Sequence, residues 1–167
     1  MKKPVSIYSD LLNSLKTTRE VSLFASDIET LTQNLFKSEK MSLVKALGSI
    51  SIKNAEIIIQ ASLKKNVKTN DKDSISDFLE TLKDIINQLK VIKLVLAFFP
   101  TYKTIEKIHN FVRDTIGIGY ILDIETNESI LAGAVVMFNG KYKDFTLSKS
   151  LDDVFSNKRG EILKPIQ

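Results

Sequence analysis

The chain contains no cysteine and only one histidine, His109, among its 167 residues. Without cysteine it forms no disulfide and offers no thiolate to a metal ion or a substrate. His109 has no second histidine at metal-binding spacing, so we expect no metal site. No two carboxylates have a spacing that suggests acid–base work. A small enzyme is therefore the least supported class, and we expect a non-catalytic protein.

Glycine is also sparse, with six residues. Gly117 and Gly119 form a Gly-x-Gly, but they follow a predicted helix and lack the third glycine of a dinucleotide-binding loop. The sequence contains no Walker phosphate-binding loop and no nucleophile-elbow motif either. We therefore expect no cofactor and no small-molecule ligand.

Long hydrophobic runs are absent. The longest spans residues 94–99, far short of the roughly 18 apolar residues that a membrane-spanning helix needs. No apolar secretory segment follows Met1. The chain is 43% hydrophobic and 26% charged, as soluble globular proteins are. We expect an intracellular protein with no direct membrane insertion.

Arginine is scarce as well, with Arg19, Arg113 and Arg159 far apart. The net charge is +4, and lysines alternate with Asp and Glu along nearly every segment. A nucleic-acid-binding protein more often concentrates its basic residues on one face, with aromatic residues between them. We expect no nucleic-acid partner, but a small basic adaptor or nucleic-acid-binding α+β module remains the alternative interpretation.

The N-terminal half has helical periodicity. Helices are expected over residues 5–16, 17–36, 38–47, 51–65 and 75–89, because their apolar residues recur every three or four positions. Thr17 and Glu20 have capping-box spacing, and Ser38 can cap the third helix. The segment 51–65 has too many apolar residues for one stripe, so we expect it to be buried on more than one side.

The period changes after residue 90. Residues 91–99 are β-branched and aromatic and end at Pro100, which predicts a strand. A helix over 102–116 follows, capped by Thr101 or Thr104, with Ile105, Ile108, Phe111, Val112 and residues 115–116 facing inward and Gly117 closing it. A strand and a hairpin complete a small sheet, for which we expect β-α-β-β order. Asn139-Gly140 predicts the type I′ turn of that hairpin.

The expected fold is therefore α+β, with a helical bundle at residues 1–90 and a small β-α-β-β domain at 91–167. The second part contains an ordered set of residues: Asp123, Asn127, Ser129, Ile-Leu-Ala-Gly at 130–133, Phe138, Gly140, Asp144, Thr146 and Leu151. This set resembles the C-terminal signature of the F-type ATP synthase delta subunit, the counterpart of the mitochondrial oligomycin-sensitivity-conferring protein.

The resemblance covers residues 91–152, including the strand that ends at Pro100. Four positions depart from the family pattern: Ala132 stands for the first glycine, Thr146 for serine, Ser148 for arginine, and Asn127-Glu128 for an Asp-Pro turn. The alanine and threonine keep size and hydroxyl chemistry, whereas the loss of the arginine removes a polar contact. In the N-terminal half, Tyr8 and Leu12 match the family's opening helix, and that half is shorter than the usual six-helix bundle.

The resemblance implies a stator protein that joins the catalytic head of a proton-translocating ATP synthase to its peripheral stalk. Its partners would be the alpha subunits, bound by the helical half, and the b subunit, bound by the second half. Its location would be the cytoplasmic face of the plasma membrane, as a peripheral part of the complex.

A helical partner would need an apolar groove on the host. The candidate residues for the alpha-facing groove lie on the first helix and on the helix at 75–89, although a bundle core explains the same residues; they are Tyr8, Leu11, Leu12, Leu15, Phe78 and Leu82. Structural roles are expected for the motif residues Ala132, Gly133, Gly140, Asp144, Thr146 and Leu151. The small pair 132–133 can let a helix pack close to a strand or mark a bulge, and Asp144 and Thr146 can hydrogen-bond the start of the next helix.

Overall fold

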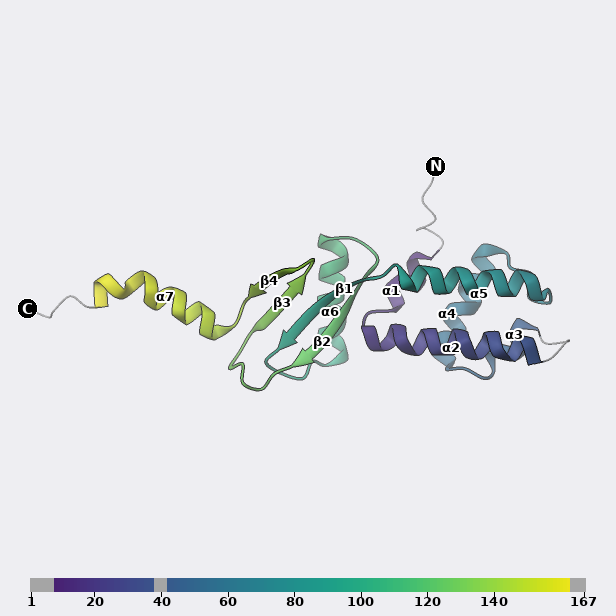
Figure 1. Cartoon of the computed structure of the whole chain (residues 1–167), viewed down its shortest axis with the longest axis horizontal. Helices are drawn as coiled ribbons and strands as arrows, with labels where there is room; N and C mark the ends of the chain where they lie inside the picture. The colour runs from purple at the N-terminus through teal and green to yellow at the C-terminus, as the bar shows by residue number, and fades with distance from the viewer. Residues whose placement is uncertain (1–7, 38–41, 163–167) are drawn as a thin grey trace, which may run out of the picture.

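The computed structural model describes residues 8–37 and 42–162, with side chains described as far as Ser156. Within these ranges, helices and strands mix as an α+β fold requires (Figure 1). The helices are α1 (Ser9–Ser14), α2 (Thr18–Lys37), α3 (Leu43–Leu47), α4 (Ile52–Lys65), α5 (Lys72–Asn87), α6 (Tyr102–Thr115) and α7 (Leu147–Ile162). The strands are β1 (Lys90–Leu96), β2 (Tyr120–Thr126), β3 (Ala134–Phe138) and β4 (Lys141–Asp144).

Helices α1–α5, here called the helical unit, share one hydrophobic core. Its largest fully buried side chains include Phe24 from α2 and Phe78 from α5, and α2 and α5 lie side by side in Figure 1. The predicted burial of α4 on more than one side is wrong, because Ile52, Ile59 and Leu63 are exposed. Only one face of α4 packs inward, and its apolar excess lies on the surface.

The capping prediction at the start of α2 is confirmed. The Thr17 hydroxyl accepts from the amide of Glu20 at 3.2 Å, and the Glu20 carboxylate accepts from the amides of Lys16 and Thr17. This reciprocal pairing satisfies amide donors that a helix N-terminus leaves free. The predicted Ser38 cap lies outside the described residues, and the observed cap of α3 is Ser42.

The sheet has the order β2-β1-β3-β4. β1 pairs with β2 in parallel, and the other two pairings are antiparallel. The chain order is β-α-β-β-β, one strand more than the expected β-α-β-β, because the predicted hairpin contributes two strands after β2. The predicted turn is confirmed: Asn139 and Gly140 both have positive φ, of 49° and 71°, as a type I′ turn requires.

Helix α6 packs on one face of the sheet, and together they form the sheet unit (β1–β4 with α6). Their core is separate from that of the helical unit and contains Ile92, Leu94, Leu96, Val112 and Leu122. Three residues expected to face inward do not, since Phe111 is 69% exposed, Ile116 is 45% exposed, and Thr115 is exposed too. The inward position on that turn of α6 belongs to His109 instead, which is buried.

Helix α7 extends away from the rest of the molecule (Figure 1). Every side chain from Leu147 to Ser156 is exposed, including the apolar residues Leu151, Val154 and Phe155. A helix with an apolar stripe in water has lost the packing that normally stabilises it. None of the described helices is long and apolar enough to cross a membrane.

Candidate functional site

The residues predicted for the alpha-facing groove separate into two groups. Tyr8, Leu11, Leu15, Phe78 and Leu82 are all buried in the core of the helical unit. Only Leu12 is partly exposed. Five of the six candidates therefore hold the helices together, as the core interpretation predicted, and they offer little surface to a partner.

An apolar groove does lie beside these residues, between α1 and α5. It has a volume of about 340 Å³. Tyr8, the N-cap of α1, and Leu12 of α1 line one side, and Ile85 of α5 and Leu89 just after it line the other. Ile118, which lies between α6 and β2, closes one side. The groove therefore takes residues from both units.

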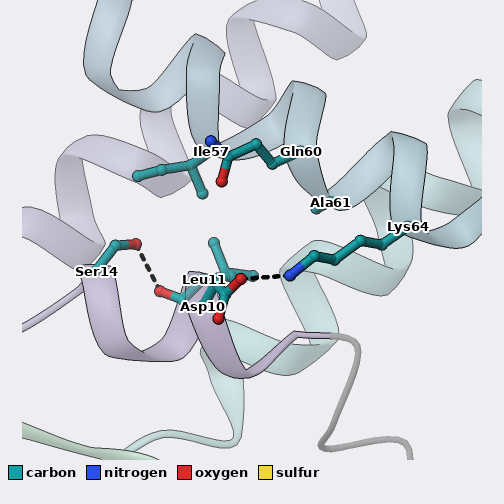
Figure 2. Close-up of a pocket in the computed structure, with 7 residues that line it drawn as sticks. All are labelled: Asp10, Leu11, Ser14, Ile57, Gln60, Ala61 and Lys64. Atoms are coloured by element: carbon teal, nitrogen blue, oxygen red, sulfur yellow. Dashed lines mark hydrogen bonds and ion pairs between the residues drawn. The ribbon is translucent and has the colours of Figure 1, made fainter.

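The opposite side of α1 is nearly closed. A cavity of only about 80 Å³ separates α1 from α4. Figure 2 shows Lys64 of α4 reaching the carboxylate of Asp10, while the Ser14 hydroxyl donates to the Leu11 carbonyl at 2.7 Å. The pKa of Asp10 is lowered by its hydrogen bond to Lys64. A partner helix therefore finds room on the α5 side of α1 and not on the α4 side.

The linker between α1 and α2 attaches the helical unit to the sheet unit. The Lys16 carbonyl accepts from the amide of Leu122 at 2.9 Å, and Thr17 forms a parallel bridge with the same residue of β2. The Thr18 hydroxyl donates to the carboxylate of Asp123 at 3.2 Å. β2 is an edge strand of the sheet, and the linker between α1 and α2 pairs with part of its free edge.

The side chain of Lys16 is the centre of this attachment, which we call the Lys16 junction (residues 16–18 with Tyr102, Glu106, Leu122 and Asp123). Lys16 is 8% exposed, and its ammonium donates to Tyr102 Oη at 2.8 Å and to Glu106 at 3.0 Å. It also lies 4.6 Å from the centre of the Tyr102 ring. Burial disfavours its charge, but the hydrogen bonds to Tyr102 and Glu106 outweigh burial and raise its pKa.

His109 is buried against β2. One ring nitrogen, Nε2, lies 3.2 Å from the Tyr120 carbonyl oxygen, so it carries the proton and donates; the other, Nδ1, is buried without a hydrogen-bond partner. Burial lowers the pKa of His109, and the positive charges of Lys16 and Arg113 lower it further. His109 is therefore a buried imidazole that packs between α6 and β2 and is held by one hydrogen bond.

Of the small pair, Gly133 makes a close backbone contact, but the contact is with the segment between β4 and α7 and not with a helix as predicted. Gly133 has φ of +98°, and a Cβ added there would lie 2.3 Å from the Phe145 carbonyl oxygen. The neighbouring Ala132 is exposed, and its carbonyl accepts from the amide of Leu147 at 2.9 Å. The start of β3 and the exit from β4 thus touch backbone to backbone.

The capping role predicted for Asp144 and Thr146 is also confirmed. The Asp144 carboxylate accepts from the Thr146 amide at 2.8 Å, and the Thr146 hydroxyl accepts from the Lys149 amide at 3.3 Å. The hydroxyl and amide of Thr146 lower the pKa of Asp144. Leu151, the last motif residue, does not join this cluster and points into solvent from α7.

A second apolar groove lies beside α6. It has a volume of about 390 Å³. Phe111 and Ile116 line it from the α6 side, and Phe138 and Phe145 line it from the hairpin and its exit. Lys141 and Lys143 of β4 also line it and make its rim basic. Phe145 precedes the first residue of α7 by two positions, so the groove lies close in sequence to the start of that helix.

Comparison with known proteins adds no identification. No protein-family model matches the chain, and no curated protein matches it significantly. Within the described ranges, no three His, Asp or Glu side chains gather as a metal site would require. The two grooves and the Lys16 junction are therefore the features on which a function can be argued.

Sequence reasoning missed the junction and Ile118. In the sequence, Lys16 cannot be distinguished from a surface lysine, because no residue near it indicates its long-range contacts with Tyr102 and Glu106. One signal was present: the capping box places residues 16–17 in extended backbone just before a helix. Extended backbone can pair with a sheet edge, but the sequence does not say which edge.

Proposed function

We propose that this chain is a non-catalytic stator component of a proton-translocating F-type ATP synthase. It would join the catalytic head to the peripheral stalk and resist rotor torque, so that proton flow drives conformational change at catalytic sites elsewhere in the complex. The observation that supports the proposal is a pair of apolar grooves in a chain of two separately packed units, which an ion pair between buried Lys16 and partly exposed Glu106 connects. The ordered motif residues between Asp123 and Leu151 add sequence support.

The groove between α1 and α5 is the proposed site for the N-terminal segment of an alpha subunit. In helix-in-groove binding, one amphipathic helix lays its apolar face between two host helices. Leu12, Ile85 and Leu89 offer partly exposed apolar surface for such contacts. This assignment keeps Leu12 from the sequence prediction and adds the partly exposed residues Ile85 and Leu89 in place of the buried ones.

The groove beside α6, continued by α7, is the proposed site for the C-terminal end of the b subunit. Its lining carries Phe111 and Phe145, both well exposed, and the stripe of α7 adds Leu151 and Phe155. Exposed aromatic residues of this kind are the anchors that dominate binding energy at interfaces. The basic rim favours an acidic or neutral partner segment.

The test is a fluorescence titration of the full chain with the alpha peptide, a synthetic peptide that copies the N-terminal segment of the alpha subunit of the same organism. We expect saturable binding with a Kd of about 10 μM or tighter, an affinity of roughly 7 kcal/mol. Leu12→Asp should abolish it, because the carboxylate would enter the apolar groove. The assignment of this groove to the alpha subunits is wrong if an unrelated amphipathic peptide binds equally well, or if the alpha peptide does not bind at ~10 μM.

The alternative, a basic nucleic-acid-binding module, finds less support in the charges. Lys16, Lys53, Lys64, Lys93 and Lys149 are each within ion-pair distance of an acidic residue. Nucleic-acid binding would weaken steeply with salt, whereas an apolar groove contact would change little. Filter binding to single- and double-stranded DNA and RNA at two salt concentrations separates these outcomes.

A further inference from the structure

The groove between α1 and α5 crosses the boundary between the two units. Most of its lining comes from the helical unit, but Ile118 and Gly119 belong to the segment that leads into β2. Ile118 is 43% exposed, so part of its apolar surface is open to a ligand. A helix lying in the groove would contact both units at once.

The two walls of the groove are attached to the sheet unit in different ways. The α5 wall is attached by the chain itself, since α5 is followed almost at once by β1, and the Lys90 amide donates to the Gly119 carbonyl at 2.9 Å. The α1 wall is attached by the Lys16 junction, because Lys16 follows Leu15, the C-terminal cap of α1. Loss of the junction would leave the units free to rotate about residues 88–89.

We infer that the partner-binding groove is shared between the two units, with Ile118 as a binding residue and Lys16 as a positioning residue that holds Ile118 against the α1 wall. The identity of the partner rests on the proposed function; the shared groove and the role of Lys16 do not. Binding in the groove and closure of the junction are then thermodynamically coupled, so each strengthens the other.

The chemistry of the occupant follows from the lining. Leu12, Ile85, Leu89 and Ile118 call for an apolar helix face. Asp84 also lines the groove, and Asp77 lies two helical turns earlier on the same stripe of α5. The occupant is therefore an amphipathic helix with Lys or Arg at the edge of its apolar face.

Peptide titrations test the role of Ile118. Two probes are used: the alpha peptide and a designed Leu–Lys amphipathic helix. We expect Ile118→Asp to weaken both by about tenfold or more, as the loss of a central apolar contact does. Ile52→Asp is the matched control, because Ile52 is equally apolar, 80% exposed and located on α4, and it should change nothing.

Distance measurements test the role of Lys16. Because the chain lacks cysteine, Ser22→Cys on α2 and Thr115→Cys at the end of α6 accept spin labels at only those two positions. We expect one narrow distance distribution for the parent chain. Lys16→Met should broaden it and weaken peptide binding several-fold, although Lys16 does not line the groove, and Lys16→Arg should restore both. Thermal melts confirm that the Lys16→Met helices remain folded.

Failure of the shared groove and failure of the proposed stator function give different results. If the designed helix binds with Ile118 dependence and the alpha peptide does not bind, the shared groove stands and the stator function falls. If Ile118→Asp leaves both affinities unchanged while Leu12→Asp abolishes them, or if neither probe binds, the shared groove is overturned. A Lys16→Met chain with parental affinity and a parental distance distribution overturns the positioning role.

Discussion

Individual residues determine the backbone path where the chain leaves β4, and Gly133 is the most constrained of them. Its φ is positive, and a Cβ added to it would lie 2.3 Å from the Phe145 carbonyl oxygen. The position therefore has no room for a side chain. The sequence predicted a small residue here for close packing. It did not predict that the neighbour would be the backbone of residues 145–146, because that contact depends on the register of β3 and β4.

Gly133→Ala should therefore destabilise the fold by about 2–4 kcal/mol, since strain from the positive φ and a backbone clash add together. Gly119→Ala is a matched control: φ is +97°, nearly the same, and nothing lies within 4 Å of the added Cβ. The control should cost only about 1 kcal/mol. Urea unfolding of both variants checks the difference, and equal losses would contradict the close contact.

His109 gives the fold a pH dependence. Its pKa in the folded state is lowered from 6.5, chiefly by burial, so the unfolded chain binds a proton that the folded chain does not. Stability then rises with pH between the folded pKa and about 6.5, and it is lost as pH falls through that window. Lys16, Glu20, Arg113 and the Tyr120 carbonyl are the groups that act on the ring.

We expect His109→Gln to flatten this dependence, because glutamine does not titrate and can still donate to the Tyr120 carbonyl. Urea midpoints at about pH 5 and about pH 7.5 measure it, on either side of the usual histidine pKa. A parental pH profile in His109→Gln would show that another group controls the titration.

At the scale of elements, the periodicity of the sequence predicted most helices, because an apolar stripe that recurs every three or four residues must be buried. α2 and α5 follow that rule closely. The rule failed where apolar residues stay exposed: Ile52 and Leu63 on α4, and Phe111 and Ile116 on α6. Sequence alone does not distinguish an apolar residue that packs inside from one that a partner covers.

Helix α7 is the clearest case of such an unburied stripe. The double substitution Leu151→Ser with Phe155→Ser should change the free energy of unfolding by no more than about 0.5 kcal/mol, as exposed positions do. It should nevertheless weaken binding of the b peptide, a synthetic copy of the C-terminal end of the b subunit, by about tenfold or more. Phe78→Ala, in the core, should cost about 3–5 kcal/mol and calibrates the urea measurement.

Two results would contradict the proposed role of α7. A large loss of stability in the double variant would mean that α7 packs against the same chain in solution. Unchanged binding of the b peptide would remove α7 from the proposed stalk-binding surface, leaving only the groove beside α6.

At the scale of the whole molecule, the helical unit and the sheet unit have separate cores, as the proposed role of a joint requires. One apolar groove lies between α1 and α5 and includes Ile118 of the sheet unit, and the other lies beside α6. The Lys16 junction connects the units, with the buried Lys16 side chain paired to partly exposed Glu106. The sequence predicted the two units from the change of period near residue 90. It could not predict the junction, because contacts over 86 and 90 residues leave no local pattern.

The measurement that tests the proposed stator function most directly is sedimentation of the full chain with the alpha peptide and the b peptide together. A joint must hold both partners at once, so we expect a ternary complex with one copy of each, formed with the same affinities as the two binary complexes or tighter. If either peptide fails to bind, or if one displaces the other, the chain is not the joint between head and stalk.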